Sequence, residues 1–330
     1  LGRPHIADPY WADKALNGGI IKRCISCLHC IESMQNNAYI GSHGECSVNP
    51  RVGREAEKLD VNGGGRQVVV IGAGPGGLTA AEFLARRGFQ VTVFEKNEKC
   101  GGQLLLAAAP PKKGKTAWMI EDLEATVRDL GVEIITGTKA TAELIKERNP
   151  YAVIVAAGSL PVKPKFPGNY TEDKVCTAEE VLSGKVTPEN KKIALIGSGL
   201  TGLETAEALV AKGCSVTIIE MADEPAPGAW MQHKDDIIPK LLAAGTGIYT
   251  SEKLTAIYND KVETENTKTK AKKTFACELT VLALGSRPDK TIVEQLQAAG
   301  IEPIVIGDCK KVGNIANATK AAYLAAISLK

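Results

Sequence analysis

The hydrophobic pattern of the chain contains one arrangement twice. Residues 67–71, QVVVI, form a short, β-branched apolar run, which is typical of a strand buried on both faces of a parallel sheet. Glycines follow, then a helical pattern over 78–87, then the strand QVTVFE. The same succession recurs from 193–196, IALI, through glycines and a helical pattern over 203–212 to the strand SVTIIE. Because each copy is the start of a βαβ unit, the repeat predicts two dinucleotide-sized sites.

The rest of the pattern combines these two units into one fold. Residues 246–284 alternate like a small antiparallel meander. The segment from residue 304 predicts a strand, a turn and a helix; it has no glycine fingerprint of its own, so we expect it to complete the first unit. The fold class is therefore α/β, with two nested Rossmann-like dinucleotide-binding domains and an N-terminal cysteine-rich segment. The expected boundaries are 1–20 for a tail, 21–62 for the cysteine-rich segment, 66–160 with 286–330 for the first domain, and 161–285 for the second.

Composition and charge exclude several classes of protein. Of the 330 residues, 44% are hydrophobic and 24% charged, which is globular composition and not that of a disordered chain. Lys plus Arg is 40 and Asp plus Glu is 38, so charge gives no reason to expect nucleic acid or an anionic membrane as a partner. No apolar run approaches the ~18 residues of a membrane helix. The N-terminus has no apolar signal-peptide core, and a cysteine cluster with scattered single thiols indicates a reducing cytoplasm.

The first glycine motif has the features of a dinucleotide-binding turn. Gly72-Ala-Gly74-Pro-Gly76-Gly77 fits G-x-G-x-x-G, follows a strand and opens a helix. Gly72 allows the sharp turn, Gly74 lets a pyrophosphate approach the backbone, and Gly77 lets helix and strand pack closely. The helix N-terminus offers unpaired N–H groups to phosphates, and Glu95 can accept hydrogen bonds from a ribose diol. The alternative is a glycine-rich turn without a ligand.

The second motif repeats this reasoning with one further inference. Gly197-Ser-Gly199-Leu-Thr-Gly202 has the same spacing, and Glu220 ends the following strand. A ribose 2′-phosphate next to that carboxylate would be repelled, and the two residues after Glu220 supply no cation. The second site is therefore expected to prefer NADH to NADPH.

Further strand ends also carry candidate residues. The runs 153–159 and 281–288 end in small residues that would let a cofactor approach the backbone, although tight packing alone would explain them equally. Asp308, after Gly307, places a carboxylate at the end of a strand, where α/β proteins bind ligands. By itself this carboxylate could equally be a helix cap.

Four cysteines lie close together near the N-terminus. Cys24, Cys27 and Cys30 are each separated by two residues, and Cys46 follows after fifteen more. Four thiolates can hold a [4Fe–4S] cluster or a structural zinc ion. Zinc ribbons usually show two separated C-x₂-C pairs, so three close cysteines plus one favour the cluster. No C-x-x-C pair occurs after residue 46, so a redox-active disulfide is not expected.

The order of these motifs resembles a known family. C-x₂-C-x₂-C…C-x₃-P, VVVIGAGPGG, CGGQ, IGSGLTG and a final IGD resemble the C-terminal half of the iron–sulfur flavoenzymes of the old yellow enzyme group. That group includes 2,4-dienoyl-CoA reductase, trimethylamine dehydrogenase, 2-enoate reductases and bile-acid NADH:flavin oxidoreductases. The stretch GRPHIADPYWADKA resembles the last turn of their flavin-binding TIM barrel, so residues 1–20 would be the tail of a barrel that lies upstream. The chain is accordingly expected to be a fragment of a longer protein.

The resemblance implies a set of cofactors and their positions. The four cysteines would bind a [4Fe–4S] cluster, the first domain FAD, the second NADH, and the upstream barrel FMN. Gln103 would face the flavin, Asp308 the ribityl chain, and Ala140 the adenine. The complete set of expected cofactor-binding residues is Gly72, Gly74, Gly76, Gly77, Glu95, Lys96, Gly102, Gln103, Ala140, Ala157, Gly158, Gly197, Gly199, Gly202, Glu220, Gly285, Gly307 and Asp308.

The resemblance also implies a function. Electrons would pass from NADH to FAD and through the cluster to FMN, which would reduce an activated C=C bond in a small-molecule substrate held by the barrel. No catalytic side chain is expected, because hydride transfer needs positioning and exclusion of water rather than an acid or base. Two alternatives stay open: a non-catalytic ADP-binding scaffold and electron-transfer module, as in amine dehydrogenases, and a separate reductase subunit like the small subunit of glutamate synthase. The cysteine spacing differs from that of dienoyl-CoA reductase, so the substrate is not identified, and homo-oligomer formation is left open.

Overall fold

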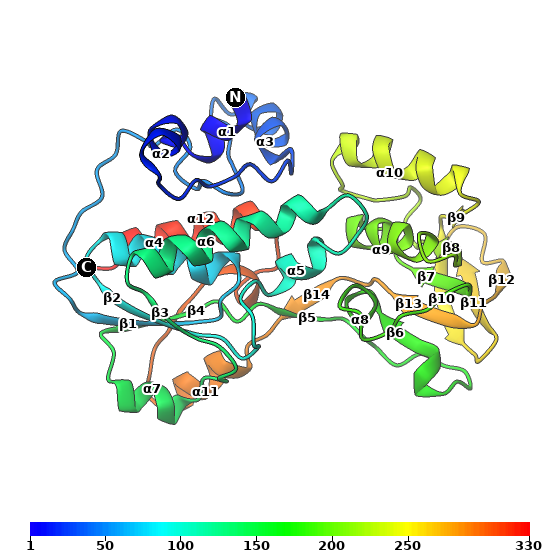
Figure 1. Ribbon diagram of the computed structural model, residues 1–330. Helices are drawn as coiled ribbons and strands as arrows, with labels where there is room; N and C mark the ends of the chain where they lie inside the picture. Colours follow the sequence, from blue (N-terminus) through cyan, green and yellow to red (C-terminus); the bar gives the residue numbers. More distant parts are fainter. The chain divides into compact units, whose positions relative to one another are not determined.

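The computed structural model describes residues 1–330 and divides into two compact units (Figure 1). The first unit contains Leu1–Leu105, Lys115–Leu160 and Arg287–Lys330, and the second contains Leu106–Gly114 and Pro161–Ser286. The second unit is thus inserted into the sequence of the first. This α/β architecture of two nested dinucleotide-binding units confirms the predicted fold class.

The first unit is built on a five-stranded parallel sheet. Its strand order is β15 (Ile304–Val305), β4 (Ala152–Val155), β1 (Gln67–Ile71), β2 (Gln90–Phe94) and β3 (Glu133–Ile135). The late strand β15 pairs with β4, so the C-terminal segment completes the first unit as expected. The central strand β1 is apolar throughout its interior because helices cover both faces of the sheet.

Helices lie on both faces of this sheet (Figure 1). On one face are α4 (Pro75–Arg86), α6 (Trp118–Asp129) and α12 (Ile315–Ser328); on the other are α7 (Ala142–Arg148) and α11 (Thr291–Ala298). Helix α4 is buried almost all round, because it packs against the sheet, α6 and α12 together. The Phe83 and Tyr323 rings meet edge to face, with centroids 4.9 Å apart. Shorter helices are α5 (Gln103–Ala107), η1 (Gly114–Ala117) and η3 (Gly307–Cys309).

The cysteine-rich segment is anchored to the first unit by ion pairs. It contains α1 (Gly2–Ala7), α2 (Trp11–Asn17) and α3 (His29–Ala38). The Lys22 ammonium lies 2.7 Å from a Glu82 carboxylate oxygen on α4, and both side chains are buried. The Arg23 guanidinium binds both oxygens of Asp122 on α6, with contacts from 2.7 to 3.1 Å. These two pairs immediately precede Cys24 and fix the start of the cysteine loop.

The second unit has a similar sheet with different covers. Its parallel strands are, in order, β6 (Val175–Thr177), β13 (Leu279–Leu282), β7 (Lys192–Ile196), β8 (Ser215–Ile219) and β9 (Gly247–Tyr249). One face packs on α8 (Ala178–Leu182), α9 (Leu200–Val210) and α10 (Met231–Ala243). The other packs on an antiparallel sheet of β10 (Glu252–Ile257), β11 (Lys261–Asn266) and β12 (Lys272–Ala276). The second unit also contains η2 (Glu172–Lys174), and β5 (Ser159–Pro161) and β14 (Ser286–Pro288) form a separate two-stranded ladder.

The predicted meander over 246–284 is only partly right. Its three middle strands are antiparallel, whereas β9 and β13 at its two ends belong to the parallel sheet. All four residues of β13 are buried, because this strand lies between β6 and β7 and is covered on both faces. Thr280 stands between apolar residues and gives the alternation of a half-buried strand, although it is itself buried.

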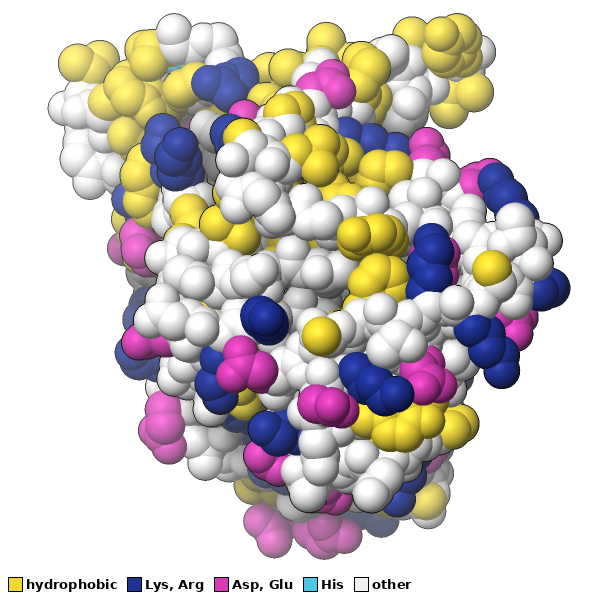
Figure 2. All heavy atoms as spheres, turned by 90° about the vertical axis from the view of Figure 1, so that its right-hand side faces the viewer, with side chains coloured by type: hydrophobic (Ala, Val, Ile, Leu, Met, Phe, Trp, Pro, Cys, Tyr) yellow, Lys and Arg dark blue, Asp and Glu magenta, His cyan; other side chains and the backbone are white.

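Two surface properties bear on partners. On the face shown in Figure 2, basic and acidic side chains are interspersed and form no large patch of one sign. None of the helices combines the length and apolar character that crossing a bilayer requires.

Candidate functional site

The first glycine motif forms an open turn at the N-terminus of α4. Gly72 has φ of +103°, and a Cβ there would lie 2.4 Å from the Ala156 carbonyl oxygen. A Cβ on Gly77 would lie 1.8 Å from the Gly72 oxygen, so only glycine allows this approach of helix and strand. By contrast, a Cβ on Gly74 would meet no atom within 4 Å. Gly74 caps α4, and no side chain satisfies the first-turn N–H groups, so the turn leaves space and donors for a phosphate.

The second glycine motif has the same geometry at the N-terminus of α9. Gly197 has φ of +101°, and a Cβ there would lie 2.5 Å from the Ala283 oxygen. A Cβ on Gly202 would lie 2.2 Å from the Gly197 oxygen, whereas one on Gly199 would meet nothing within 4 Å. The helix is again capped by a glycine without a side-chain hydrogen bond. Both turns therefore fit a dinucleotide pyrophosphate in the same way. Each leaves open space at the glycine where the pyrophosphate would lie, and each is closely packed at the glycines on either side of it.

The acidic residue of the first unit faces its own glycine motif. Glu95 is buried, and one of its oxygens accepts from the Ala73 N–H at 2.8 Å. The other accepts from the backbone and side-chain nitrogens of Asn97, at 2.9 and 2.8 Å. A carboxylate has about four acceptor positions, so three donors leave capacity for one further hydrogen bond, such as one from a ribose hydroxyl.

The acidic residue of the second unit, Glu220, also accepts backbone hydrogen bonds near its glycine motif, and it accepts a further one from a serine hydroxyl. One oxygen of Glu220 accepts from the Ser198 N–H at 2.7 Å and the Ser198 hydroxyl at 2.9 Å. The other accepts from the Ala222 N–H at 2.8 Å. Ser198 is not among the residues predicted from the sequence, although its position directly after Gly197 is a signal that could have indicated it.

A hydrogen-bonded chain connects the start of α5, the start of β5 and η3 in the first unit. The Gln103 amide donates to the Ser159 hydroxyl at 2.7 Å, and that hydroxyl lies 3.4 Å from an Asp308 oxygen. The other Asp308 oxygen accepts from the Gly313 N–H at 3.1 Å. Burial raises the pKa of Asp308, while the bonds from Gly313 and Ser159 oppose that rise. The structure thus brings Gln103 and Asp308 together through Ser159, a residue not predicted as part of the site.

Most other predicted residues lie around the same strand ends. A Cβ on Gly102 would lie 3.6 Å from the Gly74 Cα, and a Cβ on Gly76 would face Ala318 of α12. Ala140 is buried after β3, close in sequence to Thr138, whose N–H donates to the Glu95 carbonyl at 2.9 Å.

The remaining predicted positions are less enclosed. Ala157 and Gly158 follow β4, Gly307 begins η3, and Gly285 follows β13 in the second unit. Lys96 is exposed to solvent after β2.

The four clustered cysteines line one cavity in the N-terminal segment. Cys24, Cys27, Cys30 and Cys46 surround about 330 Å³ of space, counted with its open mouth. Ser26 and Leu28, between the first three, have φ of +57° and +60°. Alternating backbone conformations of this kind turn N–H groups toward a common centre, as in many phosphate and iron–sulfur sites.

Backbone N–H groups also reach the sulfurs. Cys30 receives them from Ile31 and from its own backbone, and Cys46 from Val48 and Asn49. Burial nevertheless raises the pKa of the Cys46 thiol to about 11, so without a metal it is protonated at neutral pH. A metal centre would remove that proton, because thiolates are the ligands.

Four thiolates are the ligand set of both a structural zinc site and a [4Fe–4S] cluster. No three of the chain's His, Cys, Asp or Glu side chains converge closely enough to hold a single metal ion. Zinc places each sulfur about 2.3 Å from one ion, whereas a [4Fe–4S] cube distributes four thiolates around a larger body. Four sulfurs that line one shared cavity, with N–H donors beside them, supply the ligands that a [4Fe–4S] cluster requires.

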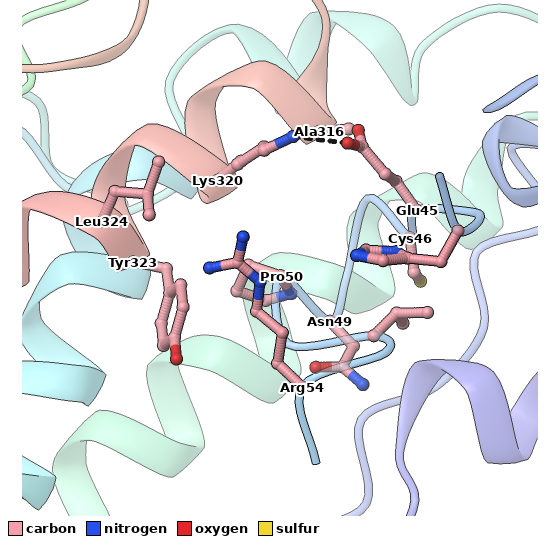
Figure 3. Close-up of a pocket in the computed structure, with 11 residues that line it drawn as sticks. Glu45, Cys46, Asn49, Pro50, Arg54, Ala316, Lys320, Tyr323 and Leu324 are labelled. Atoms are coloured by element: carbon pink, nitrogen blue, oxygen red, sulfur yellow. Dashed lines mark hydrogen bonds and ion pairs between the residues drawn. The ribbon is translucent and has the colours of Figure 1, made fainter. Parts of the chain in front are cut away.

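A second pocket adjoins the cysteine cavity. About 380 Å³ of space, counted with its mouth, lies between the cysteine-rich segment and α12, and Cys46 lines both cavities. Figure 3 shows the Arg54 guanidinium pointing into this pocket and Lys320 paired with Glu45 at its rim. No motif in the sequence predicts this pocket.

Comparisons with known proteins agree with this geometry. Residues 66–308 match the family model described as pyridine nucleotide-disulphide oxidoreductase. The chain is 36% identical to the NADH oxidase of Thermoanaerobacter brockii over 98% of its own length and 50% of the relative, and 34% identical to the bilirubin reductase of Mediterraneibacter gnavus over 99% and 50%. It thus spans about half the length of these curated relatives.

Solved structures give the same result. A 2-naphthoyl-CoA reductase complex superposes with a TM-score of 0.90 and 28% identity, over 99% of this chain and 50% of the other. Histamine dehydrogenase from Rhizobium sp. 4-9 superposes with a TM-score of 0.86 and 25% identity, over 99% of this chain and 54% of the other. The family match, which covers well over half of the chain, and the two nucleotide-type turns together identify it: this protein belongs to the pyridine nucleotide-disulphide oxidoreductase family and corresponds to the half with that fold in flavoenzymes of the old yellow enzyme type.

Proposed function

We propose that the chain is the electron-input half of a larger cytoplasmic enzyme, which takes reducing equivalents from NADH and delivers them through the four-cysteine centre to an upstream FMN-containing barrel. The barrel would reduce an activated C=C bond of enoate or enoyl-CoA type. The observation that carries the proposal is the presence, in one chain, of two open glycine turns of equal geometry and four cysteines around one cavity. Each of the two turns would bind one coenzyme, and the cysteine cavity would hold a centre that relays electrons.

The residues of the first unit would hold FAD. Its pyrophosphate would lie over Gly74 at the N-terminus of α4, and a ribose hydroxyl would use the remaining acceptor position of Glu95. Gln103, Ser159 and Asp308 would face the flavin end, where Asp308 accepts a hydrogen bond. Bound flavin and nicotinamide supply the hydride chemistry themselves, so the side chains need only orient the two rings and exclude water.

The residues of the second unit would hold NADH. Gly199 leaves the space for its pyrophosphate, and Glu220 disfavours a 2′-phosphate by charge repulsion. The four cysteines would hold a [4Fe–4S] cluster, and backbone N–H groups already reach the sulfurs of two of them, Cys30 and Cys46. The half-length coverage of the relatives supports an upstream partner domain in the same polypeptide.

Anaerobic titration of the purified chain with NADH tests this proposal. The visible flavin bands should bleach fully with about one and a half equivalents of NADH per flavin, because each NADH supplies two electrons while FAD takes two and one cluster takes one. The matched control is the Gly199→Val variant, in which flavin should remain bound and be bleached by dithionite but not by NADH. A flavin that NADH does not reduce in the unmodified chain would refute the proposal.

A scaffold role is the second candidate, favoured by the likeness to histamine dehydrogenase as well as to reductases. In that case the first site would contain ADP and no flavin bands would be present. Extraction of the bound nucleotide and its mass distinguish the two outcomes directly.

A further inference from the structure

The two glycine motifs differ at the residue after the first glycine. In the first unit this residue is Ala73, which contributes only its N–H to Glu95. In the second it is Ser198, which contributes an N–H and a hydroxyl to Glu220. The backbone bond is therefore common to both turns, and the hydroxyl is particular to the second.

The Ser198 hydroxyl connects Glu220 to the loop that follows β8. It accepts a hydrogen bond from the Ala226 N–H at 3.0 Å and lies 2.9 Å from the Glu220 oxygen. A backbone N–H can only donate, so the hydroxyl uses its one proton toward the carboxylate. Ser198 and Ala226 are both completely buried, so water does not compete for either bond.

The bridged loop has a constrained conformation. Ala226 has φ of +52°, a region that non-glycine residues seldom adopt without support. The near end of the loop is fixed by Ala222, whose N–H donates to Glu220 and whose carbonyl accepts from Ser251 at 2.7 Å. Glu220 and Ser198 thus hold the loop at two points, residues 222 and 226.

This loop would lie beside the ribose of a dinucleotide bound to the second unit. In this fold the acidic residue at the end of the second strand faces the ribose 2′-hydroxyl, and the residues after it border that position. Here those residues include Asp223 and Glu224, which pair with Lys268 and Lys234 at 3.4 and 3.7 Å. The charges of Asp223 and Glu224 are offset by these lysines, so a 2′-phosphate would be repelled by the Glu220 carboxylate, beside a loop that cannot move away while the bridge holds.

We infer that Ser198 is a specificity-determining residue: its hydroxyl bridges Glu220 to Ala226 and keeps both in the arrangement that admits an unphosphorylated ribose and excludes a 2′-phosphate. This inference rests on the proposed role of the second unit as the NADH site. Ser198 acts through Glu220 and the loop, so it is a positioning residue and not a catalytic one.

The test compares two ligands that differ only by the 2′-phosphate. The full chain, saturated with FAD so that the first site is filled, is titrated calorimetrically with ADP-ribose and with 2′-phospho-ADP-ribose. In the Ser198→Ala variant the preference for ADP-ribose should fall about tenfold, as expected from loss of a hydrogen bond to a charged group. Ser183→Ala, at an exposed position of the same unit, is the matched control and should keep the original ratio.

The ratio of two affinities separates specificity from general damage, which would weaken both ligands equally. A ratio unchanged within twofold in a folded Ser198→Ala variant would overturn the inference. Hydrogen exchange of the unmodified chain gives a second check that needs no variant: the Ala226 amide should be protected, and rapid exchange there would also overturn it.

Failure of this inference and failure of the proposed function are distinguishable. A chain that prefers ADP-ribose and loses that preference in Ser198→Ala, yet never passes electrons from NADH, would refute only the proposed function. An unchanged ratio in a chain whose flavin NADH does reduce would refute only the role of Ser198.

Discussion

The two glycine turns have nearly the same backbone geometry but different surroundings. Gly72 and Gly197 have φ of +103° and +101°, and Gly74 and Gly199 both face open space. Around the first turn, helices cover both faces of the sheet and the cysteine-rich segment is attached by buried ion pairs. Around the second, an antiparallel sheet replaces the helices of one face, and Ser198 bridges the acidic residue to a loop.

This difference separates the features that both nucleotide sites need from the features that make the two sites unlike each other. The glycine positions are dictated by a pyrophosphate and by close packing, so both copies keep them. The surroundings of the two turns would determine which coenzyme each unit holds and where its electrons go. These surroundings therefore differ between the two units. Only the first unit carries the four cysteines, so under the proposed function electrons would enter at the second unit and leave from the first.

The largest expected effect concerns the cysteines. Replacement of Cys46 by Ser should abolish the iron and acid-labile sulfide of anaerobically purified protein, because a [4Fe–4S] cluster needs all four thiolates. Cys214→Ser is the control, since Cys214 is buried in the second unit and its sulfur lies 3.4 Å from the Pro188 carbonyl oxygen, which a hydroxyl can also approach. Equal iron in the two variants would contradict the assignment of Cys46 as a ligand.

The next effect concerns the attachment of the cysteine-rich segment. Glu82→Gln would leave the Lys22 ammonium buried without a counter-charge, which costs about 3–5 kcal/mol in the free energy of unfolding. Glu121→Gln is the control: its carboxylate is 59% exposed beside Arg23, so it should cost no more than about 1 kcal/mol. Urea unfolding measures both, and similar losses would show that the buried pair has no special role.

The same pair gives a pH dependence. Burial by itself would raise the pKa of Glu82, but Lys22 and Arg86 outweigh it and the pKa lies below the ordinary value of 4.5. A lowered carboxyl pKa stabilises the folded state fully above pH 4.5, and this contribution is lost as the pH falls through the lowered pKa. Stability measured between pH 7 and pH 3 should therefore fall less steeply in Glu82→Gln than in the unmodified chain.

The two open glycines allow the nucleotide sites to be blocked one at a time. Valine at Gly74 or Gly199 would project into space that the protein leaves empty, at φ of −79° and −54°, so the fold should tolerate it. Gly74→Val should lose flavin, whereas Gly199→Val should keep flavin and lose NADH-dependent reduction by on the order of 100-fold. Loss of flavin from both variants would contradict the assignment of separate ligands.

The smallest effect concerns coenzyme choice. Glu220→Arg should shift the ratio of kcat/KM for NADPH to that for NADH upward by about tenfold, because repulsion of the 2′-phosphate becomes attraction. The measurement is diaphorase activity with an artificial electron acceptor. An unchanged ratio would exclude contact between residue 220 and the ribose.

Much of this fold was predictable because its signals are local. The strands at 67–71 and 215–219 are rich in β-branched residues, and the first glycine after each nucleotide-type strand is required by sterics. The helices begin at Pro75 and Leu200, three residues before the predicted starts, because the motif's later glycines belong to the first helical turn.

The features that were missed depend on contacts between distant residues. The Lys22–Glu82 pair joins residues 60 positions apart, and the Ser198 bridge depends on the path of a loop 28 positions later. Neither partner has a periodic pattern that indicates the other. The placement of β9 and β13 in the parallel sheet depends likewise on which strands become neighbours.

The central claim, that electrons enter at the second unit and leave through the cysteines of the first, is tested most directly by low-temperature electron paramagnetic resonance. The chain is purified anaerobically and measured before and after addition of NADH. The account predicts that NADH produces the signal of a reduced iron–sulfur cluster, and that Gly199→Val does not produce it with NADH but does with dithionite. Zinc in place of iron, or a cluster that remains oxidised while NADH fully reduces the flavin, would contradict the account.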